Sequence, residues 1–89
     1  MKIKDGFVLR EIAGEWMAVA TGTRTVEFPG LIALSETAAF LWKHMEKGAS
    51  LEELTKALTE EFDVNVETAE KDLNKFIAVI AEKGLFENE

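Results

Sequence analysis

Few side chains in this sequence are of the types that carry out covalent or metal-assisted chemistry. The chain has no cysteine and a single histidine, His44. Without cysteine there is no disulfide, thiolate nucleophile or iron–sulfur cluster, and no histidine–carboxylate set at metal-ligand spacing surrounds His44. The two serines, Ser35 and Ser50, lie at predicted helix starts and not in a G-x-S-x-G elbow. We therefore expect no catalytic residue, no bound metal and no cofactor.

Paired carboxylates and glycines are the remaining candidates for chemistry. The adjacent pairs at residues 52–53 and 60–61 are glutamates on a predicted helix and are expected to be solvated. A general acid or base needs a carboxyl with a shifted pKa in an apolar pocket, which nothing here suggests. The six glycines are scattered singly, so no P-loop or G-x-G-x-x-G fingerprint is present. These patterns argue against an enzyme and leave binding as the function class.

Charge and composition narrow the partner. The 89 residues are 47% hydrophobic and carry a net charge of −7, which predicts one globular domain over residues 1–89. Residues 1–49 hold six acidic and six basic side chains, whereas residues 50–89 hold eleven acidic side chains and four lysines. This balance argues against a nucleic-acid binder or a polybasic membrane-surface protein. No apolar run approaches the roughly 20 residues of a membrane span, and the N-terminus lacks a signal-peptide core, so we expect a cytoplasmic location.

The first part of the chain reads as strands. Residues 7–12 and 16–21 are rich in β-formers and are joined by a short turn that contains Gly14, which predicts a hairpin. Residues 25–28 alternate in polarity, but this segment is short and ends at the turn Pro29-Gly30. Residues 31–34 form an apolar run of strand length. Two or three strands are therefore predicted before Ser35.

The second part reads as three helices. Ser35 is a predicted N-cap, and the apolar positions behind it follow helical spacing up to residues 47–48. Ser50 and Glu53 fit a capping box for a helix that ends near Asp63. A third helix is predicted from about residue 66 to 83, with Asn65 as its N-cap. The fold class is therefore α+β, winged helix-turn-helix-like, with two or three N-terminal strands within residues 7–34 followed by three helices within residues 35–83.

A winged helix-turn-helix fold raises the alternative of a DNA-binding protein. The polar positions of the last helix carry four acidic residues and three lysines, and no arginine follows Arg24. A phosphate-lined groove would repel this surface, and bidentate guanine contacts from the helices are unavailable. DNA binding is therefore the function that the sequence supports least.

Two apolar features exceed what a small core needs. Residues 31–34 are apolar on both faces and, as an edge strand, would offer unpaired backbone groups to another strand. Residues 76–81 are apolar nearly all round the third helix, and Val79 lies on the flank shared with Asp72, Phe76 and Lys83. Together they would form a groove for a peptide added as a strand. The alternative is that both features are core or homodimer contacts, in a structural or regulatory interaction module. Trp42 lies on the core stripe of the first helix.

Several segments resemble one known family. Residues 30–42 (GLIALSETAAFLW) are similar to the G-x-(I/V)-x-L-(N/S)-E-T-(A/G)-A-x-(I/L)-W segment of PqqD-like proteins. Residues 48–54 resemble the family's G-x-(S/T)-x-E-E-L, and residues 60–64 its E-(E/D)-(Y/F)-D-V. Residues 72–85 resemble its D-(V/L)-x-x-F-(I/L)…G-L ending. The order and spacing of these motifs cover residues 5–86.

The resemblance implies a winged-helix-like domain of three N-terminal β-strands followed by three α-helices, which acts as a peptide chaperone called a RiPP recognition element. Such a protein binds the leader of a ribosomally made precursor peptide and presents it to a modifying enzyme, often a radical S-adenosylmethionine protein. In the family the leader adds to the third strand and lies against the third helix. Carried over by position, the peptide-binding residues are Leu31, Ile32, Ala33, Leu34, Asp72, Lys75, Phe76, Val79 and Lys83. The acidic second half predicts a groove rimmed by acid on the helix side, and hence a peptide with apolar anchors and a basic or neutral flank.

Overall fold

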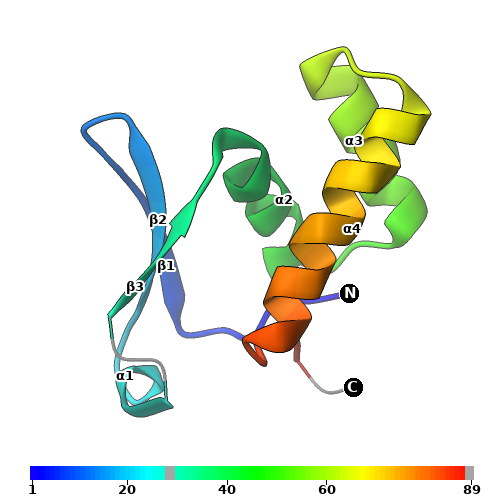
Figure 1. The fold of residues 1–89 in the computed structure, drawn as a ribbon. Helices are drawn as coiled ribbons and strands as arrows, with labels where there is room; N and C mark the ends of the chain where they lie inside the picture. The colour runs from blue at the N-terminus through cyan, green and yellow to red at the C-terminus, as the bar shows by residue number, and fades with distance from the viewer. Residues whose placement is uncertain (28–29, 88–89) are drawn as a thin grey trace.

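The structure is a computed structural model, and it describes residues 1–27 and 30–87. Within these residues the elements follow the order β1 (Phe7–Ile12), β2 (Glu15–Ala20), α1 (Arg24–Glu27), β3 (Leu31–Leu34), α2 (Glu36–Glu46), α3 (Leu51–Phe62) and α4 (Val66–Glu82). Three antiparallel strands are thus followed by three long helices (Figure 1), which confirms the α+β prediction. The three predicted helices correspond to α2, α3 and α4.

The three strands form one antiparallel sheet in the order β1-β2-β3. In the β1–β2 hairpin Ile12 pairs with Glu15, so the loop consists of Ala13 and Gly14. Both loop residues have positive φ, 53° and 80° respectively, as a type I′ turn requires. Gly14 adopts this conformation without the steric cost that a side chain imposes. The hairpin predicted from the β-forming runs is therefore present, and β3 joins it on the β2 side.

Residues 25–27 of the segment with alternating polarity form part of a short helix and not a strand. Arg24–Glu27 is the short helix α1, in which the hydroxyl of Thr25 donates to the carbonyl of Gly22 at 2.7 Å. The side chain of Val26 is 85% exposed, so no layer of the protein covers the apolar side that a strand would need to bury. Local hydrogen bonds therefore decide the conformation of this segment. Phe28 and Pro29 lie outside the described residues.

Side-chain caps fix where the three long helices begin. The hydroxyl of Ser35 accepts from the N–H of Ala38 at 3.1 Å, and the side-chain oxygen of Asn65 accepts from the N–H of Thr68 at 2.8 Å. Ser50 and Glu53 form the predicted capping box, with each side chain accepting from the other residue's backbone N–H. These hydrogen bonds satisfy backbone donors that have no partner within a helix. The N-caps predicted at positions 35, 50 and 65 are all confirmed.

Removal of the α3 cap is expected to weaken the whole fold. Hydrogen bonds from the backbone and the side chain of Ser50 lower the pKa of Glu53. Because folding lowers this pKa, the contribution of Glu53 to stability is present above its unfolded pKa and is lost as the pH falls through the folded pKa. We predict that Ser50→Ala lowers the free energy of unfolding by about 1 kcal/mol and raises the pKa of Glu53. Urea denaturation and a carboxyl NMR titration measure both effects, with Ser50→Thr as the control that keeps the hydroxyl. Equal stability of Ser50→Ala and wild type would contradict this account.

The core lies between the sheet and the helices. Trp42 is completely buried, and its ring meets the ring of Phe7 edge to face with centroids 5.6 Å apart. The prediction that Trp42 is a core residue is confirmed. The cluster also contains Ile3, Ala18, Leu41, Met45, Leu54, Leu58, Ala69, Leu73, Phe76, Ile80 and Leu85. Side chains from the sheet, the three long helices and the terminal segments therefore pack together and fix the position of α4 relative to the sheet.

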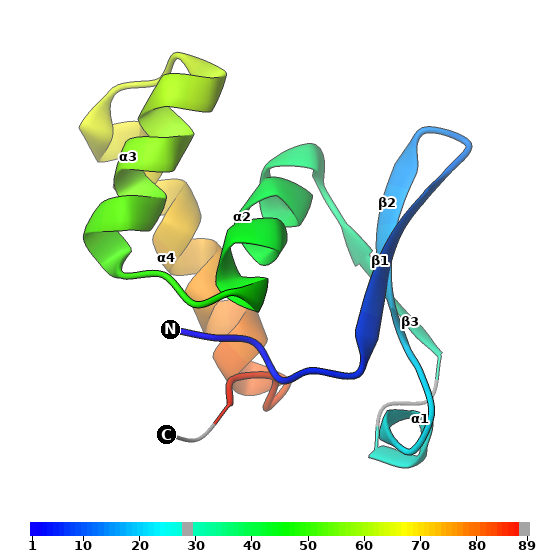
Figure 2. The ribbon, with the colours of Figure 1, turned by 180° about the vertical axis from the view of Figure 1, so that it is seen from behind.

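The two ends of the described chain close this core. The N–H of Ile3 donates to the carbonyl of Met45, and the N–H of Lys4 donates to the carbonyl of Leu85 at 2.8 Å. Ile3 also forms a β-bridge with Phe86, so the N-terminal segment lies beside the segment after α4 (Figures 1 and 2). Leu85 is fully buried after the turn at Gly84. The C-terminal end of α4 is thereby fixed at the base of the molecule.

Candidate functional site

Among residues 1–27 and 30–87, β3 pairs only with β2, so one edge of the sheet is open along β3. The N–H of Thr21 donates to the carbonyl of Gly6, and these residues continue the β1–β2 register. Hydrogen-bonded pairs alternate along an antiparallel ladder, so Met17 and Val19 bond toward β1 while Trp16 and Ala18 bond toward β3. On β3 the backbone groups of Ile32 and Leu34 therefore bond to β2. Those of Leu31 and Ala33 point to the open edge.

Helix α4 lies opposite this edge and turns toward it a flank that carries both apolar and charged side chains. Phe76 is nearly buried and forms part of the core, whereas Val79 is 44% exposed. Asp72, Lys75, Val79 and Lys83 recur at intervals of three and four residues, which places them along one side of the helix. Capping by Asn65 and burial of Leu73 and Ile80 set the rotation of α4 that directs this flank to β3.

A hollow of about 500 Å³ separates β3 from α4. Its size falls within the usual range for ligand sites in proteins, roughly 300–1,000 Å³. All nine residues named from the sequence line it: Leu31, Ile32, Ala33, Leu34, Asp72, Lys75, Phe76, Val79 and Lys83. Five further lining residues were not named from the sequence: Ser35, Thr37, Ala38, Leu41 and Ile80. Thr37, Ala38 and Leu41 follow β3 on α2, and the helical spacing of positions 37, 38 and 41 was the signal that could have found them.

The charge of this groove differs from the expected acidic rim. Its charged lining residues are Asp72, Lys75 and Lys83, two cations and one anion. Other acidic residues of α4, such as Glu67 and Glu70, do not line the groove. Because of the rotation of α4, the excess negative charge of residues 50–89 lies outside the groove. The prediction of an acid-rimmed groove is wrong, since the local charge on the helix side is slightly positive.

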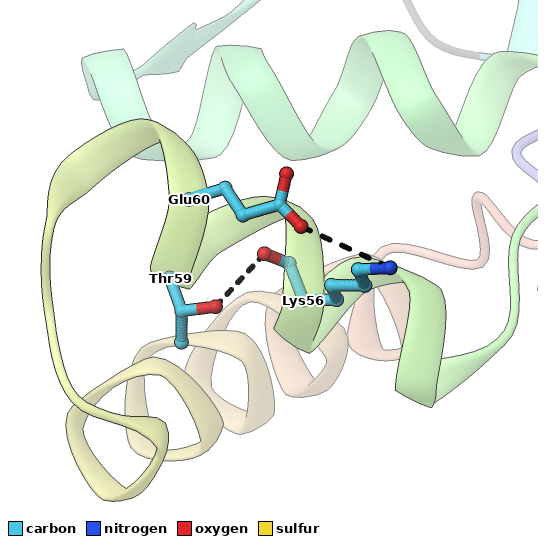
Figure 3. Close-up of polar contacts among 3 residues, drawn as sticks. All are labelled: Lys56, Thr59 and Glu60. Carbon is cyan, nitrogen blue, oxygen red and sulfur yellow. Dashed lines mark hydrogen bonds and ion pairs between the residues drawn. The ribbon is translucent and has the colours of Figure 1, made fainter.

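A second hollow lies between α3 and α4, where Leu51 and Val66 are more than half exposed. Lys56 on its rim forms an ion pair with Glu60 at 4.0 Å, and the hydroxyl of Thr59 donates to the Lys56 carbonyl at 2.9 Å (Figure 3). Both walls are helices, whose backbone groups are bonded internally. Only the β3–α4 groove combines an apolar floor with unpaired strand backbone among the described hollows, which makes it the candidate site.

The described part of the chain contains neither a cluster of metal-ligating side chains nor a membrane-spanning helix. Across residues 1–27 and 30–87, no three His, Asp or Glu side chains gather in a way that could hold a metal ion. Over the same residues, no helix is both long enough and apolar enough to cross a bilayer. The groove therefore offers a ligand its shape, its unpaired strand backbone and three charged side chains.

These features define a class of protein: a small α+β domain with a free sheet edge that faces a helix across an apolar groove. The chain belongs to the PqqD family, described as coenzyme PQQ synthesis protein D, whose match spans residues 15–85. The resemblance to PqqD-like proteins noted from the sequence motifs is thereby confirmed. No curated protein matches this chain.

A solved structure shares the fold over the full length. It is described as "TbiB1 in Complex with the TbiA(beta) Leader Peptide". The two chains are 29% identical and superpose with a TM-score of 0.74, covering 100% of this chain and 98% of the other. The similar protein thus carries a bound leader peptide on the same overall architecture.

Proposed function

We propose that this chain is a non-catalytic peptide-binding protein that holds the leader of a ribosomally synthesised precursor peptide in the β3–α4 groove. The observation that carries the proposal is the open edge of β3, whose Leu31 and Ala33 backbone groups face an apolar hollow. Membership of the PqqD family and the likeness to a leader-bound protein support the same function.

The leader would bind as a fourth strand beside β3. Its backbone would exchange hydrogen bonds with Leu31 and Ala33, each contributing roughly 0.5–1.5 kcal/mol net. Because side chains alternate along a strand, every second leader residue would point into the groove. Phe76 and Val79 provide an apolar floor there. Main-chain bonds would supply affinity, and the pockets over α4 would supply selectivity.

Presentation to a modifying enzyme follows from anchoring one end of the precursor. A leader held along β3 leaves the rest of the precursor outside the groove and available to a second protein. We propose that this protein is an enzyme of the radical S-adenosylmethionine class, which is the class the family resemblance implies. The chain itself would supply binding and orientation, and the enzyme would supply the chemistry.

The groove lysines are expected to favour an acidic or neutral flank of the leader, in place of the basic flank inferred from overall charge. We predict that the double variant Lys75→Glu, Lys83→Glu weakens leader binding about 3- to 10-fold, because exposed ion pairs contribute about 0.2–1 kcal/mol each. Calorimetric titration measures this change. The control is Lys56→Glu, Lys71→Glu, which makes the same change in net charge away from the groove. Equal affinities of the two double variants would contradict a local role for Lys75 and Lys83.

A titration tests the proposed function as a whole. The labelled chain is titrated with the leader of the precursor peptide encoded beside its gene, and amide shifts are followed by NMR. We expect the largest shifts at residues 31–34 and along the flank of α4 from Asp72 to Lys83. Absence of shifts at these positions at saturating peptide would refute the assignment of the groove as the leader site.

A further inference from the structure

The outer face of the sheet is mostly apolar, and no helix of the described residues covers it. Alternation along the strands places Phe7, Leu9, Ala18, Ile32 and Leu34 on the face that packs against the core. The opposite face carries apolar side chains as well, which is unusual for a sheet surface left to solvent. On it Val8, Ile12 and Leu31 are 36%, 55% and 58% exposed.

Register shows that these side chains form a continuous patch. Val8 pairs with Val19, which in turn pairs with Leu31, so three apolar residues make one row across the sheet. The next row is Arg10, Met17 and Ala33. Helices α2, α3 and α4 all lie on the other side of the sheet (Figures 1 and 2). We name these six residues together with Ile12 and Glu15 the outer sheet face.

The charge distribution indicates what can approach this face. Residues 1–49 are neutral in sum, whereas residues 50–89 carry the whole net charge of −7. Helices α3 and α4 contain most of that charge and lie away from the outer sheet face (Figure 1). Two copies that met through their helices would repel each other. Two copies that met through their sheets would keep the acidic helices apart by more than the Debye length of about 8 Å.

The two ionic residues of the outer sheet face are complementary to each other. Arg10 lies near its centre and Glu15 at its hairpin end, on the same side of the sheet. Neither forms an ion pair with another residue in the described part of the chain. A two-fold axis that passes midway between these two residues places Arg10 of each copy opposite Glu15 of the other, so the pairing forms twice across the contact.

We propose that the outer sheet face is a self-association surface, where two copies of this chain pack sheet on sheet about a two-fold axis. With strands about 4.8 Å apart and a rise of about 3.3 Å per residue, the face covers roughly 300 Å² per copy. The area buried by a pair is thus well below the roughly 1,200 Å² of a standard stable interface. The association is therefore weak and reversible, and the dimer forms at high protein concentration.

This arrangement leaves both grooves accessible. The contact uses side chains that project from one face of the sheet, whereas the leader site uses the edge of β3 and the flank of α4. A dimer would thus display two leader sites. Leu31 and Ala33 belong to both regions, so variants that separate the two functions are placed on β1 and β2.

Sedimentation velocity of the full chain, from about 10 µM to about 1 mM, tests the proposal. We expect the weight-average sedimentation coefficient of the wild type to rise with concentration. Val8→Lys and Arg10→Glu are expected to remain monomeric over this range. The matched control is Val66→Lys, which places the same charge on an exposed valine of α4 and should associate as the wild type does. Thermal unfolding establishes that each variant is folded.

Exchanging the charges of Arg10 and Glu15 tests the proposed pairing most directly. Glu15→Arg alone is expected to be monomeric, and the double variant Arg10→Glu, Glu15→Arg is expected to regain association. A wild type that stays monomeric at about 1 mM would overturn the proposal, as would Val8→Lys and Arg10→Glu variants that associate like the wild type. A double variant that stays monomeric when both single variants do would overturn the two-fold pairing.

Discussion

Proline at position 33 is expected to reduce leader affinity at least tenfold while leaving the sheet intact. Ala33 turns its backbone N–H to the open edge of β3, so the substitution removes a donor that β2 does not use. The leader would lose one hydrogen bond and retain an unsatisfied carbonyl, with a combined cost of about 1.5–4 kcal/mol. The proline ring would also obstruct close approach of a fourth strand. Calorimetry gives the change in affinity, and urea denaturation shows whether folding is preserved.

Glu11→Pro is the matched control for this variant. Glu11 lies on β1, and the ladder geometry turns its N–H to the opposite free edge of the sheet. The same substitution there removes the same kind of donor far from the groove. We expect wild-type leader affinity for Glu11→Pro. If Ala33→Pro binds as well as Glu11→Pro, the leader does not add to β3 as a strand.

A carboxylate introduced at position 79 is expected to reduce leader affinity more than tenfold. Val79 is 44% exposed in the free chain and lines the groove floor on α4. A bound leader would cover this position, and withdrawing the new carboxylate from water costs several kcal/mol, which ion pairing with Lys75 or Lys83 offsets only in part. The free chain pays little of that cost, because position 79 remains accessible to water. We expect Val79→Glu to change the free energy of unfolding by no more than about 0.5 kcal/mol.

Ala78→Glu separates this effect from simple charge repulsion. Ala78 is the neighbouring residue of α4, is exposed, and does not line the groove. Ala78→Glu adds the same charge as Val79→Glu at nearly the same height along α4. Fluorescence anisotropy of a labelled leader is expected to report near-wild-type binding for Ala78→Glu and a large loss for Val79→Glu. Equal losses in both variants would show that the leader does not contact the Val79 flank.

Local signals in the sequence were strong enough to predict most of the fold. Each helix start carries a polar capping residue followed by apolar positions at helical spacing, and Ser35, Ser50 and Asn65 all cap as predicted. The hairpin follows from two β-forming runs with Gly14 between them. At residues 24–27 the polarity pattern was too short to decide, and local hydrogen bonds produced a helical turn.

The groove could be predicted in its residues but not in its charge. Residues 31–34 are apolar on both faces and residues 76–81 are apolar nearly all round, which exceeds what a small core needs and suggested a groove. The resemblance to PqqD-like proteins then supplied the nine residues that line it. The local charge depends on the rotation of α4, which is fixed by the packing of Leu73 and Ile80 against other layers. The rotation of a helix relative to a sheet depends on tertiary packing. A sum over residues 50–89 could not show that Lys75 and Lys83, and not the glutamates, line the groove.

Amide hydrogen exchange at β3 tests strand addition most directly. In the free chain the N–H groups of Ile32 and Leu34 bond to β2, whereas those of Leu31 and Ala33 face the open edge. The alternation predicts slow exchange at 32 and 34 and fast exchange at 31 and 33. On addition of the leader encoded beside this gene, we expect the exchange of Leu31 and Ala33 to slow at least tenfold. Unchanged fast exchange at Leu31 and Ala33 in the saturated complex would contradict leader binding by strand addition to β3.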